Sequence, residues 1–545
     1  MDTFSIKGQI VDLVKRKIFT GEVFISHGKI AEIKPIEGAL QGPFILPGFI
    51  DAHIHIESSM LVPSEFARMA SIHGTVATVS DPHEIANVLG LDGIRFMLEN
   101  GEKVPFHFYF GASSCVPATP FETAGASLNA NTIELLFKDY HLHYLSEMMN
   151  FPGVLHHDPQ VMEKIAIANK FQVPVDGHAP GLRGEEAAAY IKAGISTDHE
   201  CFTLEEALEK IHYGMKILIR EGSAAKNYEA LHSLLETHPE NVMFCSDDKH
   251  PHELAEGHIN QLVKRSVIDK GYDVMNVLRV ACLHPVEHYN LDCGLLRHGD
   301  SADFIVIDNF QNFNVLSTYI KGFLVAQNGK TNIKSIPVPL INHFNCSPKK
   351  PENFQIKAER GKLQVIQVIE GQLMTNKILM GSRVKEGLFI TDIEKDLLKI
   401  AVVNRYHEQP IALGFINRFG LKEGAIASCI AHDSHNIICV GVTDEDMCAA
   451  VNAIIAHQGG ISVASNGKIE ILSLPVGGIM SDKEGFQVAK EYVFMDRLAK
   501  QLGTPLSAPF MTLSFMALLV IPSLKLSDKG LFDGSTFAFT PLVLP

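Results

Sequence analysis

Short apolar runs alternate with segments of helical spacing through the first half of the chain, and this alternation restricts the possible fold more than any other feature. We predict eight strands, at residues 44–50, 75–80, 105–111, 141–146, 173–177, 194–197, 215–219 and 241–245. The clearest helices between them are predicted at residues 84–99, 160–170, 184–192, 204–213 and 228–236. Strands that alternate with helices in this way favour an α/β fold with a parallel (β/α)8 TIM-like barrel, which carries its chemistry at the C-terminal ends of the strands.

Titratable residues gather where these strands end. His53 and His55 are two residues apart on the first strand, so both imidazoles point to the same face and can bind one divalent metal ion. The later strand ends add Asp81, His83, Glu84, Glu147, His178, Asp198, His199, Glu200, Arg220, Glu221, Asp247 and Asp248. Burying so many ionisable groups is costly unless a cation or mutual pairing compensates. The pattern therefore predicts a metal site at the barrel mouth.

Seven segments around these positions are long enough to serve as specific motifs. They are Asp51-Ala-His-Ile-His-Ile-Glu-Ser-Ser-Met60, Ser80-Asp-Pro-His-Glu-Ile-Ala-Asn-Val88, Ser146-Glu-Met-Met-Asn-Phe-Pro-Gly153, Val175-Asp-Gly-His-Ala-Pro-Gly181, Arg220-Glu-Gly-Ser-Ala-Ala-Lys-Asn227, Cys245-Ser-Asp-Asp-Lys-His-Pro251 and Ala431-His-Asp-Ser-His-Asn-Ile-Ile438. Together they resemble the amidohydrolase superfamily and, within it, the bacterial and archaeal adenine deaminases. The resemblance covers nearly the whole chain.

The resemblance implies a binuclear divalent metal centre, with Mn²⁺ expected and Fe²⁺ or Zn²⁺ as alternatives. His53 and His55 would bind one ion, and His178 and His199 the other. Glu147 stands where some relatives carry a carbamylated lysine, so its carboxylate would bridge the two ions. Asp247 would complete the first ion's ligands and move a proton from the bridging hydroxide to the leaving group. Asp248 is the alternative proton shuttle, and we favour Asp247 because it follows the Phe-Cys-Ser strand end directly.

The implied activity is hydrolysis of adenine to hypoxanthine and ammonia by a metal-activated hydroxide, as part of purine salvage. The expected catalytic residues besides Asp247 are Glu57 and His83. The expected substrate contacts are Glu57, His83, Glu84, Glu200, Arg220 and Ser223. Each of the first four has a second reading, as a partner that orients a metal ligand. Arg220 also has one, as the partner of a neighbouring carboxylate.

Several rival functions lack a residue that they need. An amidohydrolase acting on a cyclic amide, like dihydroorotase or hydantoinase, is the main alternative, but it would carry a lysine at Glu147 and an arginine at Glu57. Cytidine-type deaminases need a Pro-Cys-x-x-Cys motif, which the sequence lacks. Adenosine-deaminase relatives would carry a glutamate shortly after His178. A non-catalytic metal-binding or scaffold protein is the last alternative, and the loss of one ligand would favour it.

The chain of 545 residues is too long for one hydrophobic core, so we expect three domains. Residues 1–48 and 284–345 are predicted to form a small discontinuous β-sandwich domain, residues 49–283 the barrel, and residues 346–545 a C-terminal α+β domain. A helix is expected at 444–458, with Thr443 as N-cap, before a strand at 461–464. Three readings of the motif at 432–436 stay open: a further metal site, a cap on the barrel mouth, or a turn.

Composition limits the partners and the location. A formal net charge of -15 argues against nucleic acid and anionic membranes, since both reward basic patches. No signal peptide is expected, and the longest apolar run, 511–522, is too short to span a bilayer. Nine scattered cysteines indicate free thiols in a reducing cytoplasm. We therefore expect a cytoplasmic enzyme, a homo-oligomer such as a dimer, whose partner is the small molecule adenine.

Overall fold

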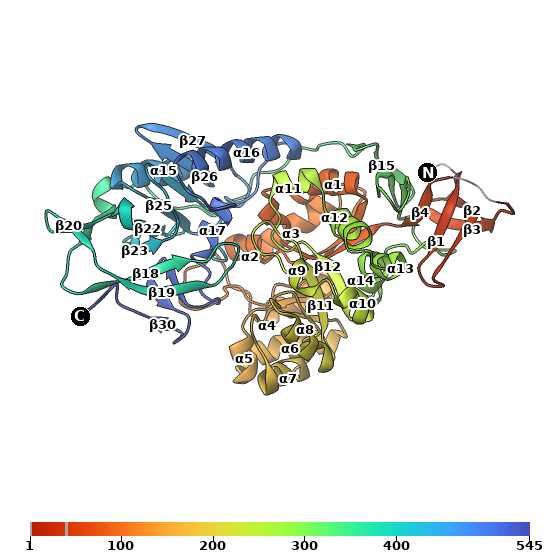
Figure 1. Ribbon diagram of the computed structural model, residues 1–545, viewed down its shortest axis with the longest axis horizontal. Coiled ribbons are helices and arrows are strands. Elements are labelled where there is room, and N and C mark those ends of the chain that lie inside the picture. The colour runs from red at the N-terminus through yellow and green to blue at the C-terminus, as the bar shows by residue number, and fades with distance from the viewer. Residues whose placement is uncertain (1–2, 39–41) are drawn as a thin grey trace.

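The computed structural model describes residues 3–38 and 42–545. Figure 1 shows an elongated molecule, with the N-terminal strands at one end, a ring of helices in the middle and the C-terminal strands at the other end. Among the described residues, no helix combines the length and the apolar composition that crossing a membrane requires.

Eight parallel strands close into a ring in the middle of the molecule. Hydrogen-bonded ladders join β5 to β6 and β7, β8 to β9, and β10 to β11 and β12. Single parallel bridges complete the ring, from Ala112 to Leu145, from Val175 to Ile195 and from Ile54 to Asp247. The α/β fold predicted from the sequence is confirmed. The strand bounds are β5 (Phe49–Ile54), β6 (Thr75–Ser80), β7 (His107–Phe110), β8 (Leu145–Met148), β9 (Val175–Gly177), β10 (Thr197–Asp198), β11 (Lys216–Arg220) and β12 (Val242–Cys245).

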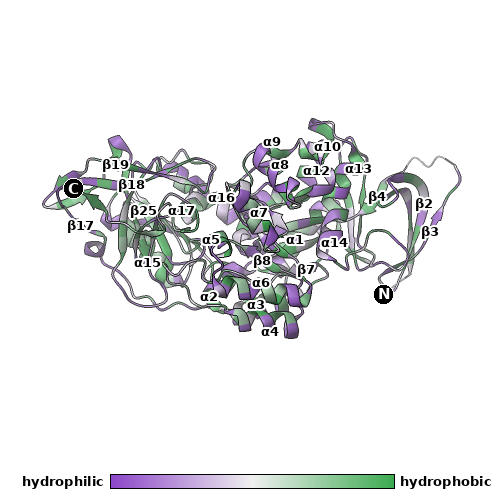
Figure 2. Cartoon of the chain, turned by 90° about the horizontal axis from the view of Figure 1, so that it is seen from below, coloured by the Kyte–Doolittle hydropathy of each residue, from purple (hydrophilic) through white to green (hydrophobic). Residues whose placement is uncertain are grey.

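Helices surround this ring. In Figure 2 they carry both hydrophilic and hydrophobic residues, as helices with one buried face do. Their bounds are α1 (Pro63–Ala70), α2 (His83–Leu89), α3 (Leu91–Gly101), α4 (Ala130–Tyr140), α5 (Phe151–Leu155), α6 (Pro159–Phe171), α7 (Gly184–Lys192), α8 (Leu204–His212), α9 (Tyr228–Leu231), α10 (Leu234–Thr237), α11 (Pro251–Glu256), α12 (Ile259–Lys264), α13 (Val274–Leu278) and α14 (His284–Tyr289).

Three predicted elements are each divided in the structure, and one of them is the helix predicted at 228–236, which forms α9 and α10. The strand predicted at 44–50 is two strands, because β4 (Phe44–Pro47) leaves the barrel at Gly48 and only β5 belongs to the ring. Gly48 passes so close to β6 that a Cβ atom there would lie 2.2 Å from Cγ1 of Val76. The helix predicted at 84–99 breaks into α2 and α3 at Gly90, whose φ of 59° does not continue a right-handed helix.

The two ends of the barrel sequence meet in one sheet beside the ring. Eight strands pair in the order β16-β15-β14-β13-β4-β1-β2-β3, so strands before the barrel lie next to strands after it. A separate apolar cluster that includes Ile10, Val23 and Phe304 packs on this sheet. The remaining bounds are β1 (Phe4–Asp12), β2 (Lys17–Ser26), β3 (Lys29–Pro35), β13 (Phe304–Ile307), β14 (Val315–Ile320), β15 (Phe323–Gln327) and β16 (Lys330–Thr331).

The C-terminal region is built on a nine-stranded sheet in the order β19-β18-β23-β22-β25-β24-β26-β27, with β31 beside β18. The helix predicted at 444–458 is confirmed as α15 (Asp444–His457), and the Oγ1 of its N-cap Thr443 accepts the N–H of Asp446. The bounds are β18 (Lys362–Val368), β19 (Thr375–Met380), β22 (Leu397–Val403), β23 (Ala412–Asn417), β24 (Ala425–Ser428), β25 (Ile437–Gly441), β26 (Gly460–Ser465), β27 (Lys468–Ser473), β31 (Val543–Leu544), α16 (Gly485–Gln501) and α17 (Pro509–Phe515). Two three-stranded sheets join this region, built from β17 (Ile356–Lys357), β20 (Arg383–Lys385), β21 (Leu388–Ile390), β28 (Leu524–Ser527), β29 (Gly530–Asp533) and β30 (Ala538–Phe539).

Candidate metal centre

Closure of the barrel brings Asp247 beside His53 of β5 and His55, which directly follows that strand. The N–H of Asp247 donates to the carbonyl of His53, and the N–H of His55 donates to the carbonyl of Asp247, at 2.9 and 3.1 Å. Asp247 has a φ of 55°, a left-handed conformation that aspartate adopts more readily than most residues. Its Oδ1 then lies 3.2 Å from Nε2 of His55 and 3.5 Å from Nε2 of His53. The strand pairing itself therefore fixes these three side chains in one group.

Glu147, inside β8, faces histidines on both sides. Its Oε1 lies 3.1 Å from Nε2 of His55. Its Oε2 lies 2.8 Å from Nδ1 of His178 and 3.3 Å from Nε2 of His199. One carboxylate thus joins the histidine group of β5 to the histidines that follow β9 and β10.

Several imidazole nitrogens at this place have nothing to bond to within the described chain. His53 is buried, and neither of its ring nitrogens has a hydrogen-bond partner among residues 3–38 and 42–545. The same is true of Nε2 of His178. Buried polar atoms are costly when unpaired, and metal coordination is one way to satisfy them. Ligand atoms of His53, His55 and Asp247 lie within 4.8 Å of one another, as do those of His53, Glu147 and His199. The donor set therefore fits a divalent metal centre.

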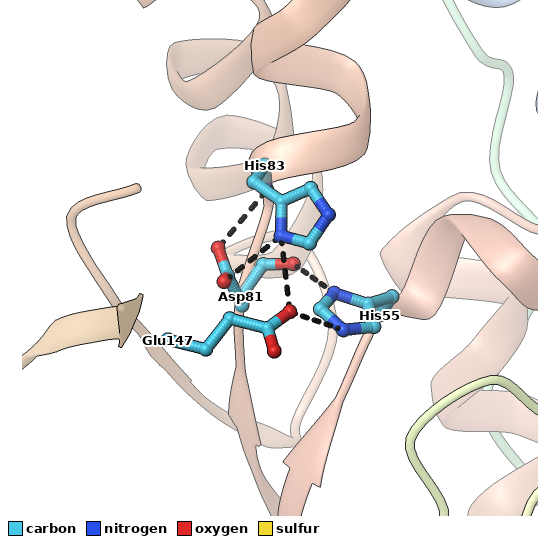
Figure 3. Close-up of side chains that lie close together, drawn as sticks. All are labelled: His55, Asp81, His83 and Glu147. Carbon is cyan, nitrogen blue, oxygen red and sulfur yellow. Dashed lines mark hydrogen bonds and ion pairs between the residues drawn. The ribbon is translucent and has the colours of Figure 1, made fainter. Parts of the chain in front are cut away.

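Asp81 and His83 support this group from the next strand. Figure 3 shows the backbone carbonyl of Asp81 facing His55, the carboxylate of Asp81 facing His83, and the ring of His83 facing Glu147. Nδ1 of His55 lies 3.1 Å from the carbonyl of Asp81, which leaves its Nε2 free for a ligand. Nδ1 of His83 lies 3.0 Å from Oδ2 of Asp81 and 3.5 Å from Oε1 of Glu147. Both readings of His83, as a substrate contact and as a partner that orients ligands, are compatible with this position.

The surrounding charges keep the ligating carboxylates ionised. Burial opposes the charged form of Glu147, but His178 and further histidine contacts hold its pKa well below its usual range. Burial likewise opposes ionisation of Asp247, and His199 and Arg220 hold its pKa well below the ordinary value. Ionised carboxylates are the form that binds a divalent cation.

Arg220 pairs with carboxylates, as the second of its two readings expects. Its guanidinium is fully buried, with Nη1 contacting Oε1 of Glu200 and lying 2.8 Å from Oδ2 of Asp247. Nη2 donates to Oε2 of Glu200 at 3.2 Å. Asp248 faces a different partner, because its Oδ1 accepts the hydroxyl of Ser58 at 2.5 Å. Burial and the adjacent Asp247 raise the pKa of Asp248.

A small cavity opens beside these residues, and the C-terminal region forms one of its walls. The barrel contributes His55, His83, Glu84, Glu147, Met149, His178, His199, Glu200, Asp247 and Asp248. The C-terminal region contributes Leu373, His432, Asp433, Phe515 and Leu518. Three of the five, Leu373, Phe515 and Leu518, carry no chemical signal in the sequence, and nothing in the strand pattern of the barrel could have selected them.

The motif at 432–436 lies against the barrel mouth. Nδ1 of His432 contacts Oε1 of Glu84, and Nε2 of His435 contacts its Oε2. Burial disfavours a charged His432, but the Glu84 carboxylate raises its pKa to about 9. Asn436 bonds to backbone, accepting the N–H of Arg405 and donating to a carbonyl of the barrel. Of the three interpretations, a cap on the barrel mouth fits His432 and His435, because both contact Glu84. The interpretation as a turn fits Asn436 only in that its side chain bonds to backbone groups.

Four predicted site residues do not line this cavity. His53 lies among the other proposed metal ligands without lining the cavity, and Arg220 contacts Glu200, which does line it. Oε1 of Glu57 accepts the N–H of Ile85 at the start of α2, and burial raises the pKa of this glutamate to about 7. Ser223 faces away from the cavity. Its hydroxyl donates to Glu253 at 2.5 Å, and the residue lines a different pocket. The metal-binding role predicted for His53 and the substrate-binding roles predicted for Glu57, Arg220 and Ser223 stay predictions.

Both regions of the chain that line the cavity match known protein families. Residues 44–325 match the amidohydrolase family, and residues 372–538 match the adenine deaminase C-terminal domain. An adenine deaminase of Sulfurovum sp. (strain NBC37-1) is 55% identical over 535 residues, and one of Salinibacter ruber (strain DSM 13855 / M31) is 52% identical over 539 residues. Each alignment covers 98% of this chain and 98% of the relative. A solved β-aspartyl dipeptidase from Fervidobacterium islandicum AW-1 matches 61% of this chain and 99% of its own, with 16% identity and a TM-score of 0.47.

Proposed function

The chain belongs to the adenine deaminases of the amidohydrolase family, and we propose that it hydrolyses adenine to hypoxanthine and ammonia. The single observation that carries this proposal is the position of Glu147, whose two oxygens face the histidines of two metal positions at the mouth of a capped barrel. Full-length relatives named adenine deaminase support the choice of adenine over a cyclic amide.

The residues that would hold the metal ions are His53, His55, Glu147, His178, His199 and Asp247. Manganese is the proposed metal, and iron or zinc would suit the same imidazole and carboxylate donors. Bound divalent ions lower the pKa of a coordinated water toward neutral, so that a nucleophile is available at about pH 7.

Asp247 is the proposed proton carrier. Its Oδ2 is held by Arg220 at 2.8 Å, while Oδ1 faces the histidine group where the attacking water would lie. It would take a proton from that water and return it to the departing amine, a role worth roughly 10²–10⁴-fold in rate. Asp248 is the weaker candidate, because its carboxylate is bonded to Ser58 on the side of the cavity.

His83, Glu84 and Glu200 line the cavity and are the proposed contacts for the purine ring. Each is also tied to a neighbour: His83 to Asp81, Glu84 to His432 and Glu200 to Arg220. These ties fix the orientation of the side chains before substrate arrives, which lowers the cost of binding. For Glu57, Arg220 and Ser223 the contacts support positioning roles rather than direct contact with adenine.

The remaining parts of the proposal concern context. We propose a cytoplasmic homodimer that acts in purine salvage. We also propose three domains, with residues 1–48 and 284–345 as the small discontinuous β domain, residues 49–283 as the barrel and residues 346–545 as the C-terminal domain; the strands of the first domain form one eight-stranded sheet rather than the two packed sheets of a sandwich. The shared sheet of β4 and β13 supports the discontinuous first domain.

The test compares substrates from two classes. Manganese-loaded protein is incubated separately with adenine, dihydroorotate and hydantoin, and the products are separated by chromatography. We expect hypoxanthine and ammonia in equal amounts from adenine alone. Protein carrying Asp247→Asn controls for contaminating activity. Turnover of a cyclic amide without any hypoxanthine would instead support the dihydroorotase-like alternative.

A further inference from the structure

One carboxylate of the C-terminal region lines the cavity, and one of its two oxygens has no hydrogen-bond partner in the described chain. Asp433 lies in the loop between β24 and β25 and is 2% exposed. Its Oδ1 lies 3.7 Å from Nε2 of His83 and 3.9 Å from Nδ1 of His432. Its Oδ2 is buried and has no hydrogen-bond partner within residues 3–38 and 42–545. An acceptor kept in this state marks a place where a donor from outside the chain can bind.

The rest of this loop is held on both sides, so that Asp433 cannot easily turn away. His432 and His435 both contact Glu84 of the barrel. The carbonyl of Ser434 accepts the hydroxyl of Tyr406 at 2.6 Å, and Asn436 bonds to Arg405 and to Thr123. A loop fixed in this way is preorganised for a ligand.

The other C-terminal residues at the cavity suit a flat apolar ring. Leu373, Phe515 and Leu518 contribute apolar surface, and the ring of Phe515 lies 5.3 Å from that of His432. On the barrel side, His83 lies between Asp433 and the proposed metal ligands around Glu147, which we call the metal-ligand group. Its Nδ1 faces Glu147 and its Nε2 faces Asp433. A planar heterocycle in this cavity would therefore have one edge at the metal-ligand group and the other near Asp433.

We propose that Oδ2 of Asp433 accepts a hydrogen bond from the imidazole-ring N–H of adenine, and so selects the free base over purines substituted at N9. The inference rests on the proposed function, because deamination at C6 directs the pyrimidine edge toward Asp247 and Glu147. The ring that remains carries one N–H, on N9 or on N7 in the other tautomer. A substituent on N9 removes that donor in both tautomers and adds bulk beside Asp433, so Asp433 is a specificity-determining residue.

The test uses 9-methyladenine, which has no imidazole-ring N–H and adds only a methyl group. The KM for adenine and the Ki of 9-methyladenine as a competitive inhibitor are measured for the metal-loaded wild type and for Asp433→Ala. In the wild type, Ki should exceed the KM for adenine by at least about 100-fold, since a site built for an N–H rejects the analogue without it. In Asp433→Ala, we expect the KM for adenine to rise about 10- to 100-fold, the usual range for a hydrogen bond to a charged group.

In Asp433→Ala, the Ki of 9-methyladenine should stay unchanged or fall. The ratio of this Ki to the KM for adenine should therefore decrease strongly, while kcat changes less than about tenfold. Asp433→Asn keeps one acceptor oxygen and should recover part of the KM for adenine. Asp482→Ala removes an exposed carboxylate from the same region and should match the wild type. An unchanged ratio in Asp433→Ala would overturn the inference.

Two further results would also overturn it. Loss of bound metal in Asp433→Ala would make Asp433 a ligand, and failure of this variant to fold would make it a structural residue. Neither is expected, because Oδ2 has no partner in the described chain and no group would lose a hydrogen bond to that oxygen. If the wild type forms no hypoxanthine from adenine, the proposed function itself is wrong. If the wild type is active and Asp433→Ala leaves the ratio of Ki to KM unchanged, only the role of Asp433 is wrong.

Discussion

Arg220→Met tests whether the charge network beneath the cavity stabilises the barrel. The fully buried guanidinium contacts two carboxylates, Glu200 through both of its terminal nitrogens and Asp247 through Nη1. Methionine fills similar apolar volume but leaves both carboxylates without their cation. Breaking a buried pair in this way costs roughly 3–5 kcal/mol in the free energy of unfolding, because an uncompensated charge stays buried.

Arg265→Met is the matched control. Arg265 also contacts two carboxylates, with Nη1 lying 3.1 Å from Glu221 and Nη2 reaching Glu229. Its side chain is 32% exposed and that of Glu229 is 62% exposed, so water screens the interaction. We expect this variant to lose less than about 1 kcal/mol.

Urea unfolding followed by circular dichroism measures both variants, since the chain has no tryptophan for fluorescence. Metal concentration is held fixed, because bound metal adds to the stability of the folded state. The contribution of Arg220 should also fall at low pH. The pKa values of Glu200 and Asp247 are depressed in the folded state, so the stability they provide is present above their unfolded pKa values and is lost as pH falls through the folded ones. Equal losses in the two variants, or a loss below about 1 kcal/mol for Arg220→Met, would show that the buried charge network does not stabilise the barrel.

Three further predictions concern the site. Glu147→Gln should weaken binding of both metal ions, because a neutral amide cannot bridge them with charge; elemental analysis that still finds two ions per chain, with full activity, would show that the bridging role is wrong. Asp247→Asn should lower kcat for adenine by several orders of magnitude while adenine still binds, and Asp248→Asn should be milder. The opposite ranking in steady-state kinetics would exchange the roles of the two aspartates. Adenosine should have a kcat/KM at least about 100-fold below that of adenine, because the C-terminal wall of the cavity should leave little room for a ribose; comparable values would contradict a base-specific site.

The sequence contained most of the information about the barrel. Buried parallel strands appear as apolar runs, and the polar residues that follow them, such as His178 and His199, mark the ends of the strands. The break at Gly48 has a signal in the sequence, since Pro47-Gly48 is a dipeptide typical of turns, but apolar residues flank it on both sides and the close approach to Val76 becomes visible only in the structure. The break at Gly90 depends on a left-handed φ in the middle of a helical pattern.

The C-terminal wall of the cavity was harder to predict. Glu84 meets His432 and His435 across about 350 residues of sequence, a contact that local patterns do not encode. Leu373 and Phe515 are ordinary apolar residues until the domain packs against the barrel. The motif at 432–436 was recognisable, but only its position against Glu84 distinguishes a cap from a turn.

We propose that the chain deaminates adenine with two divalent metal ions held by His53, His55, Glu147, His178, His199 and Asp247. The most direct measurement is ammonia release from adenine while metal-free protein is titrated with Mn²⁺. A binuclear centre around Glu147 requires that activity be absent without metal and that its rise stop at about two ions per chain. Activity that is independent of metal, or that saturates at one ion per chain, would contradict it.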